Sequence, residues 1–150
     1  MPYYIQKKKS KSPRSSKSTA VAAADKAFSA YIRLRDAMPS GYFRCISCGQ
    51  IKPFASADCG HFWSRRHMAT RFCEDNAHAE CSACNRFVAD HLATYQVNLI
   101  RKIGQTRFDL LAVKKESVCH YTEAELREIA KFYKEQAKKL SSLKQIRVKI

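Results

Sequence analysis

Acidic residues are scarce in this 150-residue chain, which has 13 Asp and Glu against 28 Lys and Arg and a formal net charge of +15. Residues 1–18 contain no acid, and from Lys138 onward every charged residue is basic. A small protein with so large an excess needs a polyanionic partner. Nucleic acid is the first candidate, ahead of an anionic membrane surface.

Long hydrophobic runs are also missing, so no segment approaches the length of a membrane span. The N-terminus has no apolar stretch of the kind that marks a signal peptide, which favours a reducing compartment for the seven cysteines. We therefore expect an intracellular, cytoplasmic protein without a membrane partner. At this length we expect one domain with extensions.

Two Cys-x-x-Cys turns are the most informative feature of the sequence. Their thiols supply the donor set of a closed tetrahedral structural zinc, and Gly49 directly after the first turn lets the backbone wrap around a metal-bound sulfur. Two unrelated dithiols or a disulfide pair are the alternatives. The predicted zinc ligands are Cys45, Cys48, Cys81 and Cys84.

Secondary structure can be predicted around these turns. Apolar spacing predicts a helix over 19–37, and 42–63 is interpreted as a β-hairpin-like unit that carries the first Cys turn and delivers His61. Further helices are predicted over 87–103 and, more weakly, 107–115. The last begins at Thr122, which opens a capping box.

The residues between and just after the Cys turns resemble the active site of the HNH nucleases. The order is Cys turn, His61, Asn76, Cys turn, Asn85. The resemblance implies a β-hairpin packed on a helix around one divalent metal, with zinc holding the two together. It also implies that His61 is the general base, Asn76 orients it and Asn85 binds the metal. The last position is Asn rather than the commoner His.

A broader resemblance covers roughly residues 20–140. Segments 31–36, 45–49, 60–62, 81–86 and 95–104 are similar to the NinG (Rap) recombination proteins of lambdoid phages. This resemblance implies an endonuclease that cuts branched recombination intermediates such as Holliday junctions and D-loops in the host-cell cytoplasm. DNA is then the main partner, with phage or host recombination proteins as further ones. Symmetric cutting of a junction would favour a homodimer.

The expected fold class is α+β, with a zinc-stapled ββα-metal core flanked by helices. The predicted divisions are a disordered basic arm (1–18), an N-terminal helix (19–41), the nuclease core (42–90, its helix continuing to about 103), a helical part (91–140) and a basic tail (141–150).

One departure from the HNH pattern concerns the residue before the base, which is often a metal-binding Asp or His but here is Gly60. Asp58 is a candidate ligand, although on a regular strand it would face away from His61 unless a bulge intervened. Water, substrate phosphate, His67 or His78 are candidates to complete the shell. Mg²⁺ or Mn²⁺ suits such a sparse site, because Mg²⁺ accepts few protein ligands.

Basic residues beside the expected base are candidates for gripping DNA phosphates, with a solvated charged face as the alternative. They are Arg65, Arg66, His67, Arg71 and Arg86.

Two other functions are consistent with the sequence. Cys59, His61, Cys73 and His78 could hold a second zinc, which would make the chain a non-catalytic module that binds DNA or RNA. A nuclease for unbranched DNA or for RNA is the other alternative.

Overall fold

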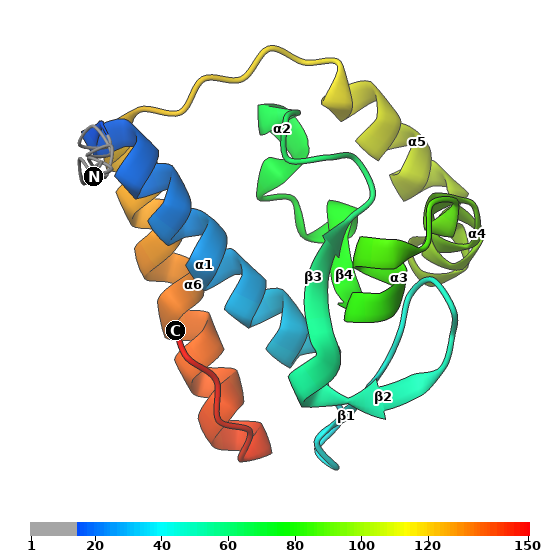
Figure 1. The fold of residues 1–150 in the computed structure, drawn as a ribbon. Coiled ribbons are helices and arrows are strands. Elements are labelled where there is room, and N and C mark those ends of the chain that lie inside the picture. The colour runs from blue at the N-terminus through cyan, green and yellow to red at the C-terminus, as the bar shows by residue number, and fades with distance from the viewer. Residues whose placement is uncertain (1–14) are drawn as a thin grey trace, which may run out of the picture.

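The computed structural model describes residues 15–150 and shows a mixed α+β fold (Figure 1). Predicted arm residues 1–14 lie outside the described part, and residues 16–18 already belong to the first helix. The helices are α1 (Ser16–Asp36), α2 (Met68–Arg71), α3 (Ser82–Phe87), α4 (His91–Ile103), α5 (Gln105–Lys115) and α6 (Glu123–Lys144), with short 3-10 turns η1 (Phe54–Ser56) and η2 (Glu74–Asn76). The strands are β1 (Tyr42–Arg44), β2 (Ile51–Pro53), β3 (Ala57–His61) and β4 (Ala77–Cys81).

Helices α1 and α6 lie side by side and run in the same direction (Figure 1). Ala24 of α1 and Ala137 of α6 are fully buried, and residues this small let two helices approach closely. The predicted capping box is confirmed: Thr122 N donates to Glu125 Oε2 at 2.7 Å, and Glu125 N donates to Thr122 Oγ1 at 3.2 Å. None of the helices within residues 15–150 has the length and apolar character needed to cross a membrane.

The strands form two separate antiparallel pairs rather than the single predicted unit over 42–63. Strand β1 pairs with β2, and the first Cys turn lies between them. Strand β3 carries His61 but pairs with β4, which follows 15 residues later and was not predicted as a strand. The sequence interpretation was wrong here because β3 finds its partner across the loop 62–76. In Figure 1, α1 lies on one side of the β3–β4 pair and α3, α4 and α5 lie on the other.

The predicted helix over 87–103 is interrupted. Helix α3 ends at Phe87, Val88 is extended, and α4 begins at His91. The two pieces are anchored to different clusters: Cys84 of α3 packs around the Cys turns, whereas Tyr95 and Leu99 of α4 pack against Phe62 and Phe108. The break lets Cys84 join the Cys turns while Tyr95 and Leu99 pack into the other cluster, and it leaves Phe87, Val88 and Leu92 exposed.

The C-terminal segment, predicted as a basic tail, folds back onto the helix pair. Ile146 is buried against α1 and α6, and Gln145 ends α6 in the left-handed conformation. Lys144 Nζ donates to the carbonyls of Leu34, Arg35 and Ala37 at 2.6–3.1 Å. An ammonium group at the end of α1 satisfies carbonyls that have no helical partner.

Candidate active site and zinc centre

Four cysteine sulfurs gather at the junction of the two strand pairs. Those of Cys45, Cys48, Cys81 and Cys84 all lie within 4.8 Å of one another. The sulfurs of Cys48 and Cys81 are 4.0 Å apart, and all four thiols are free. Two sulfurs bound to one tetrahedral zinc at about 2.3 Å are about 3.8 Å apart, so the cluster fits zinc. Four thiolates at this spacing form a closed site without a position for substrate.

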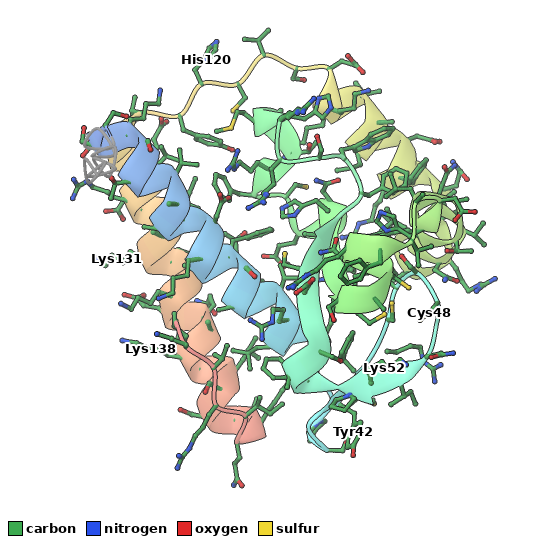
Figure 2. All side chains as sticks on the ribbon, in the orientation of Figure 1. Tyr42, Cys48, Lys52, His120, Lys131 and Lys138 are labelled. Atoms are coloured by element: carbon green, nitrogen blue, oxygen red, sulfur yellow. The ribbon has the colours of Figure 1, made fainter. Side chains whose placement is uncertain are left out.

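Local structure explains how the ligands meet. Gly49 takes φ +70° and its N–H donates to Cys45 O at 2.9 Å, which closes the first turn. Cys48 lies at the outer side of this turn (Figure 2). Cys81 ends β4, Cys84 lies in α3, and Cys81 N donates to Cys45 Sγ at 3.3 Å. Zinc bound here would staple the β1–β2 hairpin to the start of α3.

The alternative second zinc site is not assembled. Within residues 15–150 the four-cysteine cluster is the one group with metal-ligand spacing. Cys59 packs toward α1, and burial raises the pKa of its thiol to about 12. His78 lies on the opposite face of the strand pair beside Tyr95, and burial lowers the pKa of its ring to about 3. The sequence suggestion that these residues share a metal was wrong, because strand alternation separates them.

A cleft of about 380 Å³ runs along β3 between α1 and α3. It brings together five of the predicted site residues, Asp58, His61, Arg65, Asn85 and Arg86. Asp25, Ser29, Cys59 and Ser64 also line it. His67 and His78, which were suggested to complete a metal shell, do not line the cleft.

His61 is held with one ring nitrogen occupied. Its Nε2 lies 2.9 Å from Arg71 O, and because a carbonyl can only accept, Nε2 carries the proton. The lone pair is then on Nδ1. Burial lowers the pKa of His61, an effect that the Arg71 carbonyl only partly offsets. The ring is therefore neutral near pH 7, the state that a general base requires.

Asp58 reaches the cleft without a bulge. Strands β3 and β4 keep a regular register from Ala57 opposite Cys81 to His61 opposite Ala77, so Asp58 shares a face with Gly60 and points toward α3. Asn85 Nδ2 donates to its carboxylate at 3.0 Å, and Arg86 pairs with both carboxylate oxygens at 2.7 Å. Burial would raise the pKa of Asp58, but the hydrogen bonds from Arg86 and Asn85 outweigh it and hold the pKa below its usual value. The group is an ionised carboxylate.

Asn76 is fully buried and holds the loop that follows His61. Its Oδ1 accepts from Trp63 N at 2.8 Å, and its Nδ2 donates to Trp63 O at 2.9 Å and to Thr70 O at 3.1 Å. These hydrogen bonds fix both ends of the segment whose Arg71 carbonyl binds His61. Asn76 therefore contacts the loop backbone rather than the imidazole, and any orienting effect on His61 is indirect.

The basic loop divides into exposed and buried members. Arg65 and Arg66 are exposed, and Arg65 lines the cleft. Arg71 instead pairs through Nε and Nη2 with both oxygens of Asp25 at 2.9 and 2.5 Å, and its side chain is only 17% exposed. The prediction that Arg71 grips phosphate is corrected, because its guanidinium ties the loop to α1.

Glu80 was missed by sequence reasoning. It is fully buried beside the second Cys turn, where Oε1 accepts from Ser47 Oγ and lies 2.5 Å from His91 Nδ1. A Cβ placed on Gly60 would lie 2.3 Å from Glu80 Oε2. The glycine that departs from the HNH pattern is thus required by a carboxylate on the neighbouring strand. The unusual glycine directly before His61 was the only signal in the sequence that pointed to Glu80.

Comparison with known proteins identifies relatives of this chain in sequence. Residues 4–143 match the family described as "Bacteriophage Lambda NinG protein". A protein named "Protein ninG" from Escherichia phage 933W is 34% identical over 119 residues, covering 78% of this chain and 56% of the relative. "Protein ninG" from Escherichia phage lambda is 39% identical over 88 residues, covering 57% of this chain and 40% of the relative. The chain thus spans about half the length of these relatives. No solved structure matches.

Proposed function

This chain belongs to the NinG family of phage proteins, and we propose that it is a divalent-metal-dependent endonuclease that hydrolyses DNA phosphodiester bonds. The observation that carries the proposal is the cleft in which His61, Asp58 and Asn85 meet two exposed arginines. A neutral base, oxygen donors for a hard cation and cationic side chains for phosphate are the groups that phosphodiester hydrolysis needs. The net charge of +15 favours a DNA substrate.

In this mechanism His61 Nδ1 accepts a proton from the attacking water. The new P–O bond forms as the bond to the 3′ oxygen breaks, and the departing oxygen takes a proton from solvent. Asp58 and Asn85 Oδ1 would hold a Mg²⁺ or Mn²⁺ ion, which stabilises negative charge on the phosphate and the leaving oxygen. Arg65 and Arg86 contact the phosphates, and zinc held by the four cysteines would join the β1–β2 hairpin to the start of α3.

Branched recombination DNA is the substrate class that the family resemblance implies. The cleft supports a phosphodiester substrate, and the choice between branched and linear DNA is a matter for a substrate panel. Four-way junctions, D-loops, duplex and single strands, each end-labelled, should therefore be compared with Mg²⁺ and with Mn²⁺.

The deciding variant is His61→Ala. We expect cleavage to fall about 10²- to 10⁴-fold, the usual contribution of a general base, with zinc content and DNA binding unchanged. His120→Ala is the matched control, because His120 lies exposed on the connection between α5 and α6 (Figure 2). Metal-dependent cutting that survives in His61→Ala would refute the assignment of the base.

The pH dependence gives a second test of the base. Because burial holds the pKa of His61 below its ordinary value of 6.5, the acid limb of the cleavage rate should lie below pH 6.5. Protonation removes the Nδ1 lone pair, so the rate falls as pH drops through that pKa. An acid limb above pH 6.5 contradicts a buried His61 base.

One observation favours a second function, a zinc-dependent DNA-binding module without catalysis. Both oxygens of Asp58 are engaged by Arg86 and Asn85, and no divalent-ion site with three acidic, His or Cys ligands stands ready among residues 15–150 outside the zinc cluster. Firm DNA binding with no cutting by the unmodified protein in either metal would establish this alternative.

A further inference from the structure

Arg86 and Asp58, which both line the cleft, form a bidentate ion pair. Arg86 Nε lies 2.7 Å from Oδ2 and Nη2 lies 2.7 Å from Oδ1, a bidentate pair that covers both carboxylate oxygens. Asn85 Nδ2 donates to Oδ2 at 3.0 Å. A cation that binds both oxygens of Asp58 from this side must displace the guanidinium, whose positive charge also repels it.

The two partners differ in their freedom to move. The Asp58 side chain is 18% exposed and sits within β3, whereas that of Arg86 is 59% exposed in the last turn of α3. Ion pairs with so exposed a partner contribute little to stability and exchange readily. A DNA phosphate offers the same bidentate geometry to the guanidinium as a carboxylate does.

We propose that Arg86 is a positioning residue that latches Asp58 in the DNA-free protein and releases it to a divalent cation when a DNA phosphate draws the guanidinium away. The inference rests on the proposed function, since it concerns the metal of that reaction. It makes DNA and metal binding mutually favourable, because each ligand takes one member of the pair. The metal would be recruited where a phosphate is already bound.

The chain contains a matched control for this pair. Arg107 pairs in the same bidentate manner with Asp75, with Nε 3.1 Å from Oδ2 and Nη2 bonded to Oδ1. Its side chain is 61% exposed, close to the 59% of Arg86, but neither Arg107 nor Asp75 lines the cleft. Arg107→Gln removes the same charge and the same kind of bond elsewhere.

The test measures Mn²⁺ binding by electron paramagnetic resonance on zinc-loaded protein. All variants carry His61→Ala so that added DNA is not cut. Without DNA, Arg86→Gln should bind Mn²⁺ at least about fivefold more tightly than the parent, the lower end of typical coupling between sites. Arg107→Gln should match the parent, and Asp58→Asn should lose the site.

Adding a four-way DNA junction completes the cycle. The junction should tighten Mn²⁺ binding to the parent by a similar factor and have a smaller effect on Arg86→Gln, in which the latch is already open. Unfolding by urea, followed for each variant, ensures that affinities are compared between folded proteins.

Equal Mn²⁺ affinity in the parent and Arg86→Gln would overturn the latch and leave a static ion pair. An Asp58→Asn variant that binds Mn²⁺ normally would overturn it as well, because Asp58 would not be a ligand. Neither readout needs cleavage. An inactive protein in which Arg86 still controls Mn²⁺ binding would therefore refute the nuclease while retaining the latch.

Discussion

Replacing Gly60 by alanine should destabilise the protein by about 2 kcal/mol, although alanine is normally better than glycine in a strand. Gly60 is not among the glycines with positive φ, so its backbone does not require glycine. An ordinary Gly→Ala change at a compatible position stabilises by about 0.4–1 kcal/mol. Gly60→Ala should therefore lower the free energy of unfolding, whereas the same change at a strand glycine without close neighbours should raise it.

The magnitude follows from the contacts of the added methyl group. It would lie 2.3 Å from Glu80 Oε2, 2.9 Å from Glu80 Cβ and 3.2 Å from Glu80 Cδ. The carboxylate could rotate, but Cβ is fixed to β4, so the strands must separate. Overpacking of this kind costs about 1–3 kcal/mol. Moving the Glu80 side chain away from His91 also costs part of a hydrogen bond, about 0.5–1.5 kcal/mol in full.

Urea unfolding of zinc-loaded protein measures this free energy. Trp63, the single tryptophan, packs edge-on against Phe62 with the ring centroids 4.8 Å apart, so its fluorescence reports unfolding. Repeating Gly60→Ala in a Glu80→Ala background should reduce the penalty without abolishing it, because the Cβ contact remains. A neutral or stabilising Gly60→Ala, or a penalty that Glu80→Ala leaves unchanged, would refute the reasoning.

Two further predictions concern the zinc centre and the end of α1. Cys48→Ser should lose the single zinc and lower the thermal midpoint, whereas Cys119→Ser, outside the cluster, should retain both; metal analysis and thermal unfolding check this. Asp36→Asn should cost about 2 kcal/mol at pH 7, because hydrogen bonding and charge from Arg35 outweigh burial and lower the pKa of Asp36 from 3.8 to about 2. Because the pKa of Asp36 is lowered in the folded state, its stabilising contribution is complete above about pH 3.8 and is lost as pH falls toward 2. Urea unfolding at about pH 6 and pH 8 should therefore show the same difference in free energy of unfolding between the wild type and Asp36→Asn.

Local patterns in the sequence were sufficient for several parts of this protein. A Cys-x-x-Cys turn places two sulfurs on one metal through a few backbone angles, so the ligands Cys45, Cys48, Cys81 and Cys84 could be predicted without the fold. The capping box at Thr122 is likewise complete within four residues. Family membership could be predicted from the same segments, because the order of motifs along the chain can be recognised without knowing how they pack.

The pairing of strands could not be predicted in this way. Strand β3 is short and pairs across the 15-residue loop 62–76 with a strand that has no clear alternation, so its partner depends on packing between α1 and α3. The roles of Arg71, Asn76 and Glu80 depend on this pairing. Each is a polar side chain whose partner lies on another element, and no spacing along the chain specifies that partner.

The sequence by itself determined which chemical groups the protein has: four thiolates at zinc spacing, a histidine between them, two asparagines and an excess of cations. Tertiary structure alone decided which of these groups are free to act. It buries Arg71 against Asp25 and leaves the side chain of Arg86 exposed while it pairs with Asp58. It also engages Nε2 of His61 with the Arg71 carbonyl, which leaves the lone pair on Nδ1. The reason is physical: ligand spacing is set by covalent geometry, whereas burial and pairing are set by contacts between residues distant in the chain.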